Sequence, residues 1–159
     1  MGYHRSTVYI EAPPEEVWKV LTNAERRPEW EDAIVEVRDV TGPMDRVGTR
    51  WVEVRSERGK TFPATMEVTR VEAPRLIEWT GPLPAGARLL FRVTLEPRNG
   101  GTQKRVDAES KLPLGPVGKL LDRLVVQRMW TRWAEEHGTR SDEKLKTLVE
   151  SEHTRAASS

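Results

Sequence analysis

A predicted strand passes directly into a predicted helix near the N-terminus, in the segment Ile10-Glu11-Ala12-Pro13-Pro14-Glu15-Glu16-Val17-Trp18-Lys19-Val20-Leu21. The two prolines end the strand, because proline has no N–H for the sheet, and they suit the first turn of a helix. Glu15 and Glu16 place negative charge at the positive end of the helix dipole. Val17, Trp18 and Leu21 recur at helical spacing and form one apolar face. The segment therefore predicts a strand followed at once by a short amphipathic helix.

Alternating residues on either side of this segment predict a sheet. Residues 3–11 alternate, with Ser6, Val8 and Ile10 on one face, and form the first predicted strand. Six more strands are predicted at residues 34–40, 49–57, 61–71, 76–80, 87–96 and 102–112, separated by turns rich in glycine, proline or asparagine. Strands joined by short turns are antiparallel, because a parallel return needs a crossover. The helical insert after the first strand is the one crossover, so the first strand is expected beside the seventh.

Helical periodicity replaces the alternation from Gly115 onward and continues to about Glu150. Gly138 lies inside this predicted helix and costs about 1 kcal/mol relative to alanine, so a bend or break is expected there. Residues 151–159 are polar and predict a flexible tail. A second short helical turn is predicted at Ala24 to Arg27. The fold class is therefore α+β, a seven-stranded curved antiparallel sheet wrapped around a long C-terminal helix, with two short helices between strands 1 and 2.

Length and composition exclude several classes of protein. The chain has 159 residues, which favours a single domain, here residues 3–150. It has 26 basic and 25 acidic residues and a formal net charge of +1, which does not favour a nucleic-acid partner. The absence of cysteine excludes thiol chemistry and fits a cytoplasmic location. No apolar run approaches the length of a membrane span, so no stable membrane insertion is expected.

The predicted layout leaves room for a cavity. A strongly curved sheet cannot contact a straight helix along its whole length, and the gap is a concave, largely apolar site for a small molecule. The alternative is that large side chains simply fill the gap. Strand and helix parity predicts that the wall of the cavity contains Trp30, Met66, Trp79, Phe91, Val93, Met129 and Trp133.

An ordered set of segments carries a family resemblance over residues 3–150. The set contains residues 10–18, Trp30, the segment Val47-Gly48-Thr49-Arg50, residues 71–79 and residues 114–121. Together they resemble the START-like superfamily, also called SRPBCC or helix-grip, and within it the polyketide cyclase/dehydrase and lipid-transport group. The resemblance implies a hydrophobic cavity that holds a lipid, an isoprenoid quinone or an aromatic polyketide. The superfamily also includes hormone receptors and ring-hydroxylating oxygenase domains, and none of the segments is a catalytic motif.

The histidines do not form a metal site or a catalytic set in the sequence. They are His4, His137 and His153, and only His137 is expected near a pocket. A metal needs three or four convergent ligands, and the chain has neither a cysteine nor a two-histidine helical pair. The pattern therefore predicts no metal and no cofactor, which also argues against the iron-dependent oxygenases.

Two charged segments allow more than one interpretation. In residues 128–133 the arginines could bind a nucleobase or an anionic head group through cation–π contacts, but a helix with Met129 and Trp133 inward and the arginines outward is favoured. Trp51, Glu53 and Arg55 share one strand face, and the valines between them share the other. Counting apolar residues favours the valines as the inner face. In the opposite case a buried carboxylate could carry a proton.

Three functions follow from these alternatives. The first is binding, carriage or sequestration of a small hydrophobic molecule, which requires a dry apolar pocket. The second is a polyketide cyclase or dehydratase, which requires a buried acid or base near the ligand. The third is a protein-interaction module with a filled cavity and exposed tryptophans. The loop at residues 82–86 is either a lid or a plain connection, and the sequence leaves the oligomeric state open.

Overall fold

Seven strands form one antiparallel sheet in the part of the chain that the computed structural model describes, namely residues 2–83, 86–111, 115 and 127–159, without the side chains of Gln127, Met129 and Trp130. The strands are β1 (Gly2–Ile10), β2 (Ile34–Arg38), β3 (Arg50–Glu57), β4 (Lys60–Glu72), β5 (Leu76–Pro82), β6 (Arg88–Arg98) and β7 (Gly101–Lys111). Their order in the sheet is β1-β7-β6-β5-β4-β3-β2. The first strand therefore lies beside the seventh, as predicted, and Gly2 pairs with Ser110 at one end of this pair.

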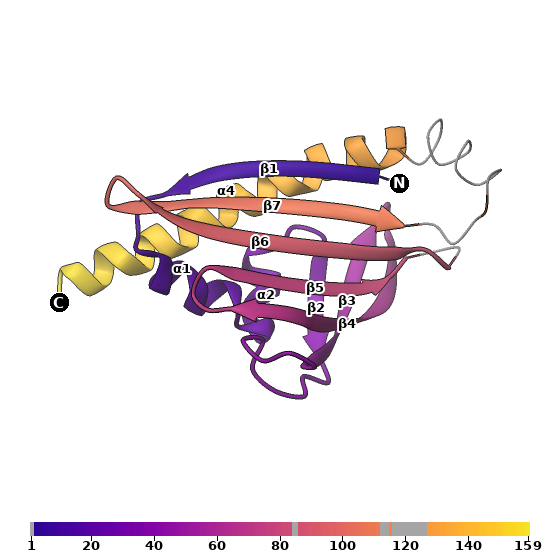
Figure 1. The fold of residues 1–159 in the computed structure, drawn as a ribbon, viewed down its shortest axis with the longest axis horizontal. Coiled ribbons are helices and arrows are strands. Elements are labelled where there is room, and N and C mark those ends of the chain that lie inside the picture. The colour runs from indigo at the N-terminus through magenta and orange to yellow at the C-terminus, as the bar shows by residue number, and fades with distance from the viewer. Residues whose placement is uncertain (1, 84–85, 112–114, 116–126) are drawn as a thin grey trace.

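The helices are α1 (Pro14–Leu21), a 3₁₀ turn η1 (Ala24–Arg26), α2 (Arg27–Trp30) and α4 (Gln127–Ala157). Figure 1 shows α4 extending along the sheet near β1, with α1 and α2 between its C-terminal half and the other strands. Helix α4 contacts β1, α1 and α2. The predicted helix-grip architecture is thus confirmed. The start predicted for the last helix, near Gly115, and the loop at residues 82–86, interpreted as either a lid or a plain connection, fall wholly or partly outside the described residues.

The C-terminal helix differs from the prediction in two ways. It is continuous through Gly138, so the break expected at this residue does not occur. It also continues past Glu150 to Ala157. Glu152 binds Arg26 at 2.5 Å and His153 binds Glu16 at 2.7 Å, so contacts with η1 and α1 stabilise the last turns. Sequence periodicity could not show these contacts, because they are polar.

The inner face of β3 is the opposite of the one predicted. Trp51, Glu53 and Arg55 are buried, whereas Val52 and Val54 are only partly buried. The neighbouring strand β4 turns Ala64, Met66 and Val68 to the same inner face. Counting apolar residues fails here because a carboxylate and guanidinium groups neutralise one another inside the protein, so the polar face can be buried.

Candidate ligand cavity

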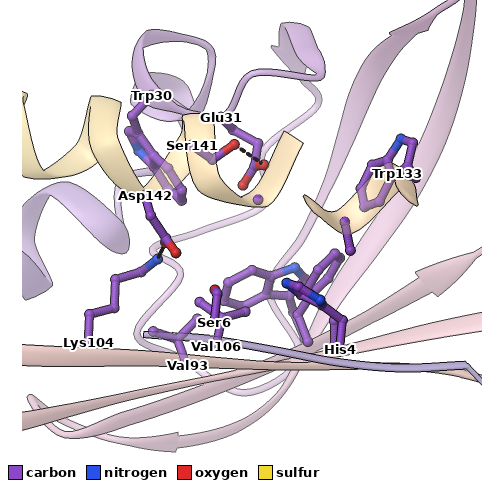
Figure 2. A pocket seen from close by; sticks show the side chains of 15 residues that line it. His4, Ser6, Trp30, Glu31, Val93, Lys104, Val106, Trp133, Ser141 and Asp142 are labelled. Carbon is purple, nitrogen blue, oxygen red and sulfur yellow. Dashed lines mark hydrogen bonds and ion pairs between the residues drawn. The ribbon is translucent and has the colours of Figure 1, made fainter. Parts of the chain in front are cut away.

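A small cavity of about 50 Å³ lies between the inner face of the sheet and α4. Figure 2 shows its floor, formed by His4, Ser6, Val93 and Val106 on the strands, and its roof, which includes Trp133. A buried water needs roughly 10–15 Å³ of such space, so the cavity has room for a few water molecules. Aromatic side chains fill much of the gap between the curved sheet and the helix, and this small space remains.

Five of the predicted wall residues line this one cavity, namely Trp30, Trp79, Phe91, Val93 and Trp133. Met66 does not line it. Its side chain is buried in the core, in a position where a Cβ on Gly81 would clash with its sulfur. Met129 belongs to α4, but its side chain lies outside the described residues. Arg128 and Arg132 are exposed, as expected for the outer face of the helix.

The aromatic part of the wall lies over a buried arginine. The rings of Trp79 and Phe91 are 5.6 Å apart at a tilt of 32°. Behind them, the Cζ atom of Arg27 is 4.9 Å from the ring centre of Trp79, 5.3 Å from that of Trp30 and 5.6 Å from that of Trp51. Arg27 is 1% exposed, so these cation–π contacts form away from water, where they are strongest. The arginine fixes the orientation of two rings that line the cavity.

Two polar contacts join α4 to the rest of the cavity wall, and both are drawn in Figure 2. Lys104 on β7 donates a hydrogen bond to Asp142 on α4, and both side chains are buried. Ser141 donates a hydrogen bond of 2.9 Å to Glu31, which follows α2. These contacts tie one turn of the helix to both the sheet and the short helices.

Three ring nitrogens at the cavity have no hydrogen-bond partner among the described residues. They are His4 Nε2, Trp30 Nε1 and Trp79 Nε1, and each is buried from solvent. An unsatisfied buried donor or acceptor costs about 1–3 kcal/mol, and native proteins keep only a few such groups. All three side chains line the cavity, so water or a ligand bound there can supply a partner that the protein does not.

Glu53 forms a buried charge cluster next to these rings. It accepts hydrogen bonds from Arg55 Nε at 2.7 Å and from Trp51 Nε1 at 3.1 Å, and Arg27 Nε lies 3.4 Å away. Burial acts to raise the pKa of Glu53, but the charges of Arg55 and Arg27 and the hydrogen bonds outweigh burial and lower the pKa. A carboxylate held ionised in this way is a poor proton carrier. The catalytic role considered for a buried Glu53 is therefore not favoured.

The positions of the histidines correct the sequence-based prediction. His4, which was expected to lie away from any pocket, lines the cavity. His137, which was expected near it, binds Asp32 through Nδ1 at 3.0 Å, and its ring lies 5.3 Å from that of Trp133. Asp32 also accepts a hydrogen bond of 2.6 Å from Lys144, which is the main reason that its pKa is lowered.

Several lining residues were not predicted, although parity could have indicated some of them. His4 shares its strand face with Ser6, and Lys104 shares its face with Val106 and Ala108. We did not predict these polar residues because we expected the wall of the cavity to be apolar. Ser141 and Asp142 on α4 gave no signal, since polar residues on a long helix usually face solvent.

Metal-binding clusters and membrane-spanning helices are both absent from the described ranges. No group of three or more histidine or acidic residues comes together there as a metal-binding cluster. No helix in the same ranges combines the length and the apolar character needed to cross a bilayer.

The fold and the cavity together define a helix-grip protein of the START-like superfamily. The sequence matches one family model over residues 4–150, described as polyketide cyclase / dehydrase and lipid transport. The chain therefore belongs to this family. A search of curated proteins gave no match.

Solved structures of similar proteins share the fold at low sequence identity. The crystal structure of Ara h 8.0201 is 16% identical, with a TM-score of 0.71 over 94% of this chain and 97% of that one. Protein MLL2253 from Mesorhizobium loti is 24% identical, with a TM-score of 0.68 over 92% and 96%. The di-domain ARO/CYC BexL from the BE-7585A biosynthetic pathway is 18% identical, with a TM-score of 0.70 over 94% and 47%. Identities this low support the shared fold and not a shared ligand.

Proposed function

We propose that the protein binds and carries, or sequesters, a small and largely aromatic molecule in the cavity between the sheet and α4. The observation that carries this proposal is the combination of an aromatic wall with His4 Nε2, Trp30 Nε1 and Trp79 Nε1, three buried nitrogens that lack a partner at the same cavity. Burial of an apolar surface gives roughly 25 cal/mol per Å², so a flat ring against Trp79 and Phe91 would be held mainly by this effect. The family match supports ligand binding in general.

The size of the cavity limits the ligand. Its volume of about 50 Å³ is well below the roughly 300–1,000 Å³ that is usual for ligand pockets. Binding therefore requires movement of the wall, and Phe91 and Trp133 are only partly buried, so they can move more easily than the fully buried Trp30 and Trp79. Among the ligand classes that the family resemblance implies, a compact aromatic molecule requires less expansion than a long-chain lipid or an isoprenoid quinone.

Native mass spectrometry of the protein purified from its own host tests the proposal directly. A copurifying small molecule is expected, and it should be lost in the variant Ala134→Leu, which fills the cavity from α4. The control is Ala156→Leu, the same substitution at an exposed position of the same helix. Absence of any bound molecule, together with identical tryptophan fluorescence titrations of both variants with aromatic probes, would exclude binding in this cavity.

A cyclase or dehydratase is the second candidate function, and the position of His4 favours it. The Nε2 atom of His4 has no hydrogen-bond partner among the described residues, and an imidazole nitrogen beside a bound ligand can accept or donate a proton. Incubation with a linear poly-β-ketone and analysis of the products tests this function. His4→Leu should abolish any cyclised or dehydrated product, and His153→Leu, a change far from the cavity on α4, should not. Equal product in both variants would exclude His4 as the proton carrier.

The interaction module is the least favoured function. Trp18, Trp30, Trp51 and Trp79 are buried, and Trp133 lines the cavity. These five rings therefore do not form an exposed surface for a partner.

A further inference from the structure

On the sheet, the wall of the cavity has a polar part on β1 and an aromatic part on β5 and β6. His4 and Ser6 are two residues apart on β1 and therefore share its inner face, at a spacing of roughly 6–7 Å along the strand. Their partners on β7 are Ala108 and Val106, which add no polar atoms. Trp79 on β5 and Phe91 on β6 form the aromatic part. A ligand that matches both parts has an apolar body and a polar edge.

The charges around the cavity are already balanced. Lys104 is paired with Asp142, and Arg55 is paired with Glu53. Arg27 lies 3.4 Å from Glu53 and 3.7 Å from Glu31. These contacts match three cations with three carboxylates, so no cation of this set remains to neutralise a bound anion. An anionic ligand would bury a negative charge without compensation, which is far more costly than burying a hydrogen-bonded neutral group.

The nitrogens without partners define the polar group of the ligand. An indole N–H can only donate, so Trp30 and Trp79 require an acceptor. His4 Nε2 donates or accepts according to its tautomer. A neutral oxygen meets both requirements, and a hydroxyl oxygen meets them for either tautomer.

We infer that the ligand of this cavity is an uncharged aromatic molecule whose oxygen, a hydroxyl or a carbonyl, is hydrogen-bonded by His4 Nε2 while its ring lies against Trp79 and Phe91. This inference rests on the proposed function and adds the chemical class of the ligand. It excludes carboxylates such as fatty acids, and it makes His4 the residue that determines specificity.

Three single-ring probes of similar shape test the inference, namely p-cresol, toluene and p-toluate. NMR titrations at about pH 8, where an ordinary imidazole is neutral and a phenol is protonated, follow the indole N–H signals. These signals are assigned with the variants Trp30→Phe and Trp79→Phe. We expect p-cresol to bind about 5- to 10-fold more tightly than either other probe, which is the value of one net hydrogen bond. At least one of the two indole signals should move downfield with p-cresol.

Variants of His4 separate recognition from packing. His4→Leu should remove the preference for p-cresol and leave toluene binding within about twofold. His4→Gln, whose amide nitrogen reaches nearly the same position, should restore part of the preference. His153→Leu is the matched control and should behave like the unchanged protein.

The outcomes distinguish failure of the inference from failure of the proposed function. If toluene or p-toluate binds as tightly as p-cresol, the inference is wrong but the cavity still binds small molecules. If the unchanged protein and His4→Leu prefer p-cresol equally, His4 does not recognise the oxygen of the ligand, and the inference is also wrong. If no probe moves any cavity signal, the proposed function fails, and the inference fails with it.

Discussion

Lys104 on β7 donates a hydrogen bond to Asp142 on α4, and the two side chains are 2% and 6% exposed. This pair is a buried ionic link between the sheet and the C-terminal helix at the cavity, and Lys104 Nζ also lies 6.0 Å from the ring centre of Trp30. The position of the helix over the cavity therefore depends on a charge pair as well as on apolar packing.

Removal of one member of this pair should be strongly destabilising. Asp142→Ala leaves the ammonium group of Lys104 buried without a counter-ion, and breaking such a pair costs about 3–5 kcal/mol. Urea unfolding, followed by circular dichroism, measures the free energy of unfolding. The double variant Lys104→Met with Asp142→Leu should recover most of the loss, because no uncompensated charge remains.

The control for this prediction is an ion pair on the surface. Arg50 and Glu67 are 2.9 Å apart, but their side chains are 61% and 40% exposed. Glu67→Ala should therefore change the free energy of unfolding by less than about 1 kcal/mol. An equal effect of Asp142→Ala and Glu67→Ala would show that the buried pair does not hold the helix.

Glu53→Gln should be destabilising although the side chain keeps its shape. The neutral amide cannot balance Arg27 and Arg55, both buried, and a loss of about 3 kcal/mol is expected. Glu36→Gln on β2, an exposed position, should change stability by less than about 0.5 kcal/mol. Thermal and urea unfolding measure the stability of the two variants. Similar stabilities would mean that the Glu53 cluster is hydrated.

Stability should fall in acid. Burial acts to raise the pKa of Glu53, but its arginine partners lower it below the ordinary value of 4.5, and the hydrogen bond from Lys144 lowers the pKa of Asp32 below 3.8. Each carboxyl therefore has a lower pKa in the folded protein than in the unfolded chain. The contribution of these carboxylates to the free energy of unfolding is complete above their ordinary pKa and is lost as the pH falls through their pKa in the folded protein. We therefore expect stability to decrease below about pH 4.5.

Urea unfolding between about pH 7 and about pH 3 tests this dependence. The free energy of unfolding should decrease steadily below about pH 4.5, and Asp32→Asn should make the decrease shallower. Stability that stays constant or rises on acidification would contradict the predicted direction of both pKa shifts.

The sequence predicted the architecture well because the features that determine it are local in the chain. The prolines at 13 and 14, the two-residue alternation of the strands and the short turns determine where each element begins and how neighbouring strands pair. The predicted pairing of β1 with β7 needed only the rule that parallel strands require a crossover, and the structure confirms it.

The buried polar groups at and around the cavity could not be predicted in the same way. Whether Glu53 faces inward depends on Arg27, which lies on α2, a separate element earlier in the chain. Likewise, burial of Lys104 depends on Asp142, on an element far along the chain. Counting apolar residues considers each strand by itself. It therefore assigned the wrong face of β3 to the interior, and it did not place His4 at the cavity.

The substitution Gly138→Ala should increase stability and weaken binding. A Cβ at this position would lie 3.6 Å from His4 Nε2, which is ordinary contact, so Gly138→Ala causes no clash with its surroundings. Alanine should raise the free energy of unfolding by up to about 1 kcal/mol, because glycine is a poor residue inside a helix.

The same methyl group would occupy space beside His4 Nε2 and should weaken the binding of p-cresol several-fold, as measured by NMR titration. Thr139→Ala, at the next and exposed position of α4, is the control, since it also favours the helix but adds nothing to the cavity. It should raise stability and leave binding unchanged. If Gly138→Ala binds p-cresol as the unchanged protein does, the ligand does not lie between His4 and the helix, because a group added there must compete with a molecule bound at that place.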